Sequence, residues 1–321
     1  MGVLLLSVNG LLVYLAITIV PELVESVISQ KLSGYVSTKR LIEVGVMFAC
    51  LTLDCAVLGW ESSALRKLFQ FSNSAMHDFT MWLIAVSGLG ALGAAVFSFG
   101  QTVLAPKVAQ AMAGPIQIES LQGHWMGFVA SFLVIDFVYY WYHRALHRLR
   151  FAWEFHKYHH AATEFTLLTG ARVHLLENAV FVVAVSFPVA IIGIPPETFL
   201  AVAIAFAAID MMQHSMVDWD YGVVGRWAFF SPTGHRIHHS MLQEHRDHNF
   251  GNFLTIWDHM FGTWYAGDAV CNEIGIDDNH FKNENPISAH LDCILRSFWV
   301  LRPRNSAVRP KFNEGAADIG H

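Results

Sequence analysis

The stretch LQGHWMGFVASFLVIDFVYYWYHRALH, residues 121–147, decides the fold class, because a long apolar segment runs directly into two histidines. A helix needs about 20 consecutive apolar residues to cross the hydrocarbon core of a bilayer. Residues 121–142 meet that length. If the helix continues, His143 and His147 project from one face, one turn apart. The stretch therefore predicts a membrane helix that carries histidines just beyond its apolar part.

The whole chain is too apolar for an ordinary soluble protein, with 54% hydrophobic and 14% charged residues over 321 positions and a mean hydropathy of +0.40. Segments long enough to enter a bilayer lie at 3–20, 41–59, 80–105, 121–142, 178–193 and 197–212. The first has no basic start and no small-residue cleavage site, so we expect a retained span rather than a secretory signal. We predict an all-α membrane protein with at least four transmembrane helices and a cytoplasmic histidine-rich helical cap.

We interpret residues 1–321 as a single membrane domain with three regions. Residues 1–142 form mainly a transmembrane scaffold, residues 143–264 a histidine-bearing catalytic region, and residues 265–321 a polar C-terminal extension. The catalytic region includes an apolar pair at 178–212, joined by Pro195-Pro196. Because each half is short for a full span, we interpret the pair as a hairpin that enters and leaves the membrane by the same face.

The hairpin makes a prediction about where the histidines lie. Since both of its ends would reach the same membrane face, residues 143–174 and 214–262 should meet there. Basic residues are frequent on that side and absent from the hairpin tip, which by the positive-inside rule makes the histidine face cytoplasmic. These basic residues are Arg144, Arg148, Arg150, Lys157, Arg172, Arg226, Arg236 and Arg246.

Charge and cysteine content exclude other classes. A net charge of -6 and a pI near 6.3 leave no basic stripe for nucleic acid. The cysteines form no CxxC pair and therefore indicate neither a zinc knuckle nor a disulfide framework. They are Cys50, Cys55, Cys271 and Cys293.

Thirteen of the 18 histidines lie between positions 143 and 259, and their spacing is regular. In HKYHH, residues 156–160, three histidines stand at i, i+3 and i+4. The same pattern recurs in HRIHH, residues 235–239. One helical turn between imidazoles is a common way to bring two ligands to one metal ion. The three clusters comprise His143, His147, His156, His159, His160, His235, His238 and His239.

So many histidines exceed the needs of one ion, and we therefore predict a centre with two metal ions. Imidazole binds zinc, iron, copper and nickel alike, so the ligand type leaves the metal open. A zinc-dependent membrane enzyme and a membrane metal-binding or transport protein are the alternatives. A transporter would place its ionisable ligands within the spans near the midplane, whereas these clusters follow the ends of apolar segments.

The histidine clusters and their surroundings resemble the fatty acid hydroxylase and sterol desaturase superfamily of integral membrane proteins. The resemblance covers about 130 residues in order. Besides the three histidine boxes it includes Asp136 in DFVYYWYHRALH, His174 in ARVHLLE, His214 in QHS, and the ending DHNFGNFLTIWDHMFGTW at 247–264.

This resemblance implies an enzyme with two iron ions that uses O2 as co-substrate and oxidises a C–H bond of a membrane lipid. The reaction would be hydroxylation or desaturation of a sterol, a fatty acyl chain or a related lipid. The chain shows no cytochrome b5 motif, no dinucleotide fingerprint and no ferredoxin-like cysteine set. We therefore expect a separate electron donor of the ferredoxin or cytochrome b5 type with its reductase.

The resemblance and the spacing together predict a ligand set and its supports. His214 joins the eight box histidines as a ligand, and Asp136 is expected to accept the second ring N–H of a ligand histidine. Further supporting candidates are His174, Asp247, His248 and Asn249. Asp210 and Asp218, four residues before and after His214, are additional candidates to bind or orient a ligand. Histidines outside the boxes, namely His77, His124, His280, His290 and His321, are expected to be structural.

Overall fold

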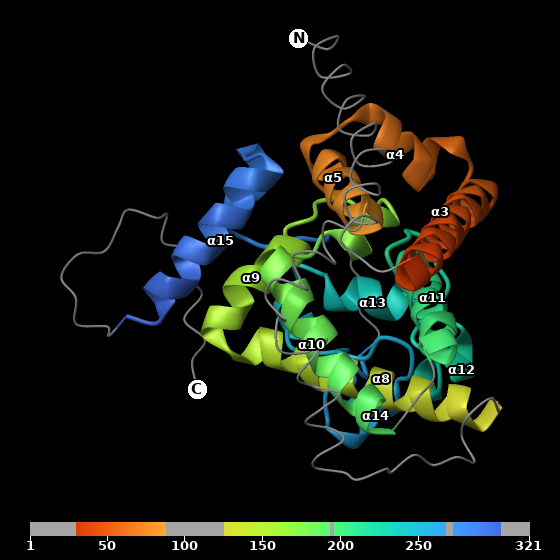
Figure 1. Ribbon diagram of the computed structural model, residues 1–321. Coiled ribbons are helices and arrows are strands. Elements are labelled where there is room, and N and C mark those ends of the chain that lie inside the picture. The colour runs from red at the N-terminus through yellow and green to blue at the C-terminus, as the bar shows by residue number, and fades with distance from the viewer. Residues whose placement is uncertain (1–29, 88–124, 193–195, 268–271, 303–321) are drawn as a thin grey trace.

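The computed structural model describes residues 30–87, 125–192, 196–267 and 272–302. Within these ranges it consists of helices and loops, with two isolated bridges and no sheet (Figure 1). The expected span at 3–20 and most of that at 80–105 lie outside them.

The longer helices begin and end as follows: α3 Gln30–Leu58, α5 Asn73–Ser87, α8 Trp125–Arg148, α9 Arg150–His160, α10 Leu175–Ile192, α11 Pro196–Gln213 and α15 Pro286–Val300. Shorter helices join them: α4 Ala64–Gln70, α12 Gly222–Trp227, α13 Pro232–His238 and α14 Ile256–Met260. Single 3-10 turns are η2 Trp60–Ser62, η4 Leu168–Ala171, η5 Gln243–His245 and η6 His280–Asn283.

Two of the described helices are long and apolar enough to cross a membrane, Leu41–Leu58 within α3 and the whole of α8. Both were expected from the sequence. The sequence predicts at least four transmembrane helices, and the described residues contain two candidate spans. α8 continues past Tyr142 to Arg148, as the spacing of the first histidine pair required, so this pair stands on the last turns of a candidate span.

The apolar pair 178–212, which we predict to form a membrane hairpin, corresponds to α10 and α11, and both of these helices pack against α8. Val185 of α10 and Val202 and Phe206 of α11 form one buried apolar cluster with Ile135 of α8. The ring of Phe132 lies 4.8 Å from that of Phe206. The start of α10 and the end of α11 both lead to histidines, so the segments before and after the hairpin meet, as predicted.

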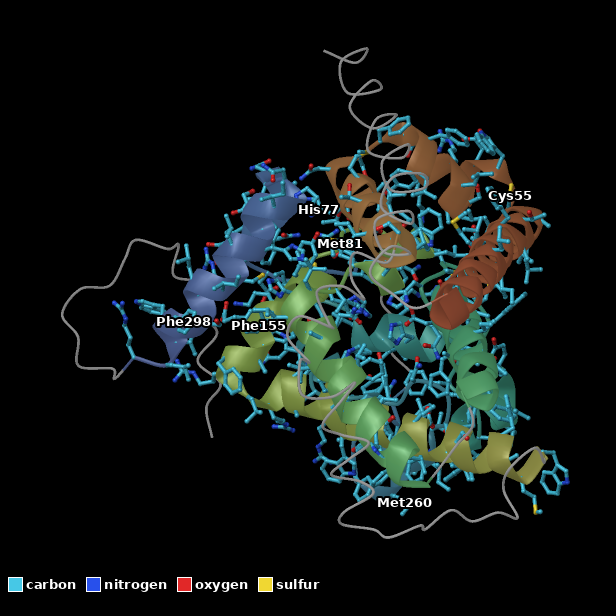
Figure 2. All side chains as sticks on the ribbon, in the orientation of Figure 1. Cys55, His77, Met81, Phe155, Met260 and Phe298 are labelled. Carbon is cyan, nitrogen blue, oxygen red and sulfur yellow. The ribbon has the colours of Figure 1, made fainter. Side chains whose placement is uncertain are left out.

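The region expected to be a polar extension contains a packed helix, α15. It begins with a capping box between Asn285 and Ser288 and has a proline at its first position, both strong start signals. Ala289 and Cys293 are buried in a cluster with Tyr158 of α9, and Figure 2 shows Phe155 between the two helices. The difference from the prediction arises because half of α15 is apolar at helical spacing.

A buried carboxylate ties α5 to the connection between α9 and α10. Asp78 accepts hydrogen bonds from the hydroxyls of Thr166 and Thr169, each at 2.7 Å, and lies 3.5 Å from the guanidinium of Arg172. Arg172 also donates to the carbonyl oxygen of Tyr158 at 3.0 Å. This network fixes the chain immediately after the middle histidine cluster.

We expect Asp78→Ala to lower the free energy of unfolding by about 3–5 kcal/mol, because it leaves the Arg172 charge buried without its partner. The exposed pair of Arg66 and Glu61, 3.1 Å apart, provides the control. Glu61→Ala should cost less than about 1 kcal/mol. Denaturant unfolding in detergent micelles measures both, and equal losses would contradict a buried role for Asp78.

Candidate metal centre

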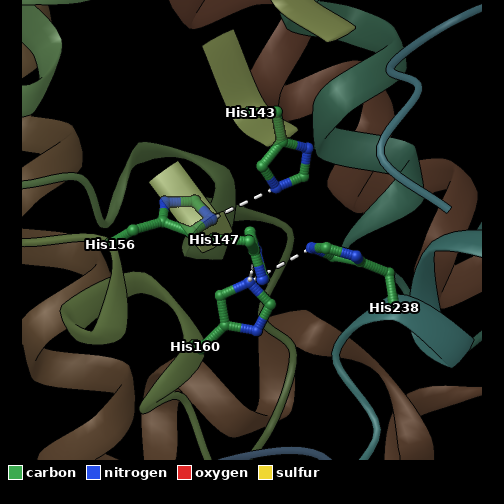
Figure 3. A group of neighbouring side chains, drawn as sticks. All are labelled: His143, His147, His156, His160 and His238. Atoms are coloured by element: carbon green, nitrogen blue, oxygen red, sulfur yellow. Dashed lines mark hydrogen bonds between the residues drawn. The ribbon is translucent and has the colours of Figure 1, made fainter. Parts of the chain in front are cut away.

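The nine predicted ligand histidines come together in two groups. The first holds five residues and the second four, and within each group one ring nitrogen per residue lies within 4.8 Å of all the others. The first group, His143, His147, His156, His160 and His238, is drawn in Figure 3. The second group is His159, His214, His235 and His239.

Helix geometry decides how the clusters divide between the groups. Residues one full turn apart stay together: His143 with His147, and His156 with His160, in the first group. His159, three residues after His156, points instead into the second group. The third cluster divides the opposite way, with His235 and His239 in the second group and His238 in the first. α9, and α13 together with its C-cap residue, therefore each contribute histidines to both groups.

Local sequence explains why α13 presents its histidines here. Ser231 caps its N-terminus by accepting from the backbone N–H of Gly234 at 3.0 Å, and Pro232 occupies the first helical position. The helix then ends at once, with His239 as its C-cap. Three histidines thus lie within little more than one turn, and all three are buried.

Hydrogen bonds to Nδ1 aim the Nε2 atoms inward. The Nδ1–H of His143 donates to the carbonyl oxygen of Phe250 at 2.9 Å, and that of His238 donates to the carbonyl of His248 at 2.8 Å. His214 does the same to the carbonyl of Asp210 at 2.8 Å. Because a carbonyl can only accept, each Nδ1 carries the hydrogen and each neutral ring keeps its lone pair on Nε2.

A sharp loop supplies two of these carbonyls. Asp247 and Asn249 have φ values of 60° and 61°, in the left-handed region that Asn and Asp tolerate better than other side-chain-bearing residues. Asn249 holds the loop in place by donating to the carbonyl of Gly234 and accepting from the backbone N–H of Tyr265. The D-x-N pattern therefore positions the acceptors of His238 and His143.

Nε2 lone pairs of neighbouring histidines face each other, and this indicates where a metal ion would bind. His156 Nδ1 lies 2.7 Å from Oε1 of Glu177, so it also carries its hydrogen there, and its Nε2 faces the Nε2 of His143 at 3.1 Å. Two nitrogen lone pairs at this distance repel unless a positive charge lies between them. The same proximity holds for His214 and His235, whose Nε2 atoms are 3.0 Å apart.

Burial keeps the remaining imidazoles neutral. It lowers the pKa of His238 to about 3 and lowers the pKa values of His159, His160, His235 and His239 well below their usual range. Neutral imidazole is the form that binds metal. These rings are therefore ready to act as ligands at neutral pH.

The donor set fits a pair of metal ions. Nitrogens that each lie about 2.1 Å from one ion stand about 3.0–3.4 Å apart, and neighbouring Nε2 atoms here are separated by 3.0–3.4 Å. His239 has no hydrogen-bond partner at either ring nitrogen, although it is buried. A buried ring with two unpartnered nitrogens suits a ligand of a metal ion.

Several predicted supports take other positions. Asp136 bonds no histidine; it accepts from the backbone N–H groups of Phe253 and Leu254 and from the indole of Trp257. It thus anchors the final motif on α8. His174 stacks on His290, with ring centres 4.4 Å apart, and lies in neither histidine group. Because His290 belongs to α15, this contact ties His174 to that helix and gives it a structural role.

The other candidates lie around the site. Asp247 has its carboxylate 3.9 Å from Nδ1 of His147, and His248 contributes only its carbonyl, to His238. Asp218 pairs with Arg236 and contacts no ligand histidine. Asp210 lies beside His214, with 3.7 Å between Oδ1 and Nδ1. The carboxylate of Asp210 leaves no room for a side chain at Gly170, where a Cβ would stand 1.7 Å from Oδ2.

Sequence reasoning missed several residues that contact the histidines, Glu177 and Trp153 among them. Glu177, bonded to His156, is the only charged residue of α10, and a lone carboxylate in an apolar helix is itself a functional signal. Trp153 lies against both His147 and His160, with ring centres 4.9 and 5.4 Å apart. No sequence signal identified its contact with the two rings.

Comparison with known proteins agrees with the resemblance. A family model described as fatty acid hydroxylase matches residues 128–263, which hold every member of both histidine groups. The resemblance to the fatty acid hydroxylase superfamily is confirmed over this region. Among solved structures none matches the chain.

Curated relatives include lipid oxygenases. The chain is 34% identical over 172 residues to an alkylglycerol monooxygenase of Xenopus tropicalis and 29% identical over 173 residues to that of Homo sapiens. These matches cover 53% of this chain and 38% of each relative. It is 28% identical over 137 residues to the ornithine lipid hydroxylase OlsE of Rhizobium tropici, covering 43% of this chain and 41% of the relative. The chain thus matches about two fifths of these relatives' length.

We expect Glu177→Ala to weaken metal binding about 10–100-fold, because it removes the acceptor that fixes the His156 tautomer. Metal content after titration with a competing chelator measures the change. Glu154→Ala is the control, since Glu154 is also largely buried but pairs with Lys157 at 2.8 Å. Unchanged metal retention in the Glu177 variant would refute its orienting role.

The buried neutral histidines also predict how the metal-free protein responds to acid. A histidine has a pKa near 6.5 when unfolded, and that of His238 falls to about 3 on folding. The unfolded chain binds more protons between these values, so stability is complete above about pH 7 and falls as the pH drops. Each such histidine contributes about 1.4 kcal/mol per pH unit. Thermal unfolding of chelator-treated protein at pH 8 and pH 5 tests this, and equal midpoints would contradict it.

Proposed function

We propose that the chain is a non-haem diiron oxidoreductase that uses O2 to oxidise a C–H bond of a membrane lipid. The observation that carries the proposal is the pair of groups of five and four histidines, largely buried, with ring nitrogens that converge in each. Nitrogen ligands that resist oxidation suit iron in an oxygenase. The names of the relatives, monooxygenases and a hydroxylase of lipids, support the same reaction class.

The two groups would each hold one iron ion, and the pair would supply the activation of O2 and the oxidising power. The protein's own contribution is positioning. Phe250, His248 and Glu177 orient ligand rings through Nδ1. Burial of eight of the nine histidines excludes bulk water from the reacting groups. The candidate spans below the site would present a lipid to it.

Hydroxylation is the preferred reaction, because the relatives named are hydroxylases and monooxygenases. Desaturation begins with the same hydrogen abstraction and is the alternative outcome. A fatty acyl or alkyl chain is the preferred substrate class, and a sterol is the second.

We propose that the histidine face is cytoplasmic and receives electrons from a separate donor of the ferredoxin or cytochrome b5 type. The positive-inside rule supports the cytoplasmic orientation. Two of the basic residues counted for it, Arg172 and Arg236, are buried and pair inside the protein. The argument rests on the exposed residues Arg148, Arg150, Arg226 and Arg246.

Metal analysis of freshly purified protein tests the proposal directly. We expect about two iron ions per chain, as one ion for each histidine group requires. Zinc that iron reconstitution does not displace would favour a zinc-dependent membrane enzyme instead. A single exchangeable ion would favour a metal-binding or transport protein.

We expect His156→Ala and His235→Ala each to reduce lipid oxidation more than 100-fold, because each removes a ring from one group. The measurement is incorporation of label from 18O2 into lipids of a host that expresses the protein. His280→Ala is the control, since His280 pairs with Asp292 away from both groups. Labelled lipid in the His156 variant at the wild-type level would exclude the proposed site.

A further inference from the structure

A cavity of about 270 Å³ lies between α3, α11 and the residues that lead into α13. We call it the α11 groove and define it by Ile209, Met212, Gln213, Tyr221, Phe230 and Phe253. The proposed function does not use it. Apart from one amide and one phenol, these side chains are apolar, so the groove suits a hydrocarbon ligand.

The groove borders a candidate membrane span. Cys50, which also lines it, belongs to the apolar stretch Leu41–Leu58 of α3. A hydrocarbon chain arriving from a bilayer would meet this opening without crossing water. The lining therefore points to a lipid-like molecule rather than to a polar metabolite.

One polar atom of a residue that lines the groove has no partner. The side chain of Gln213 is 1% exposed, and its Nε2 donates to the carbonyl oxygen of Asn252. Because that carbonyl can only accept, the other amide atom must be Oε1, an acceptor, and it has no hydrogen bond. A buried acceptor without a donor is costly, so Oε1 is suited to a donor on a ligand.

Two residues that line the groove connect it to the second histidine group. Gln213 directly precedes His214 of the second histidine group. The ring of Phe230 lies 6.4 Å from that of His235 in the same group. A donor held by Gln213 would thus stand next to the proposed reaction site, with its hydrocarbon part extending toward Phe253 and Met212.

We propose that the α11 groove binds a lipid whose polar end carries a neutral O–H donor, with the hydroxyl hydrogen bonded to Oε1 of Gln213. Ether and ester oxygens and ionised carboxylates cannot supply that hydrogen. The assignment of this lipid as the substrate rests on the proposed function. Binding itself does not require the oxidation reaction.

Photolabelling of the full-length protein in lipid nanodiscs tests the inference. The probes are a C16 alcohol with a diazirine in its chain and the corresponding methyl ether, which lacks only the donor. We expect both to label groove residues, with the alcohol favoured about fivefold, as one neutral hydrogen bond allows. Peptide mapping should place the labels on Ile209, Met212 and Phe253. Equal labelling by both probes, or no labelling of these residues, would overturn the proposal.

Variants then separate the donor site from the hydrocarbon site. Gln213→Met keeps the length of the side chain but removes the acceptor, so the preference for the alcohol should vanish while labelling by the ether persists. Met212→Trp should fill the groove and reduce labelling by both probes. Met260→Trp, at an exposed methionine outside the groove, is the matched control and should change neither.

The wild-type comparison does not depend on how the variants fold. Alcohol-selective labelling in protein that oxidises no lipid would support the groove and contradict the proposed function. Lipid oxidation together with equal labelling by the alcohol and the ether would support the proposed function and contradict the groove proposal. The two hypotheses therefore fail separately.

Discussion

The repulsion among nine converging imidazole lone pairs is the constraint on which the rest of this structure depends. Each group brings several Nε2 atoms within 4.8 Å of one another in a buried space. Such an arrangement is unfavourable without positive charge, and the surrounding protein must hold it in place. For four of the nine rings, those of His143, His156, His214 and His238, hydrogen bonds at Nδ1 do this, because they fix both the tautomer and the direction of the ring.

The supports of the centre come from distant parts of the chain. Glu177 opens α10, Phe250 and His248 belong to the loop before α14, and Asp136 anchors that loop from the middle of α8. One candidate span thus carries His143 and His147 at its end and, further back, the anchor of the loop that supplies acceptors to His143 and His238. Damage to α8 would therefore affect ligands and supports together.

Helices outside the centre limit what can reach it. α15 covers α9 on one side through Cys293 and Ala289. On another side, the α11 groove stays open between α3 and α11, lined by apolar groups up to Gln213. Among the described residues, α15 thus covers the helix that bears the middle histidine cluster, and the α11 groove includes Gln213, the neighbour of His214 in the second group.

The sequence by itself determined the histidine clusters, their helical placement and the continuation of α8, because helix geometry converts i and i+4 spacing directly into neighbouring rings. The sequence could not show that His159 lies in a different group from His156 and His160, or that His238 lies in a different group from His235 and His239. That division depends on how α9 and α13 cross. Asp136 was expected at a histidine, yet it bonds backbone N–H groups more than 100 residues away. Only the tertiary structure decided such partners, because a buried hydrogen bond forms between groups that folding brings together, whatever their separation in the chain.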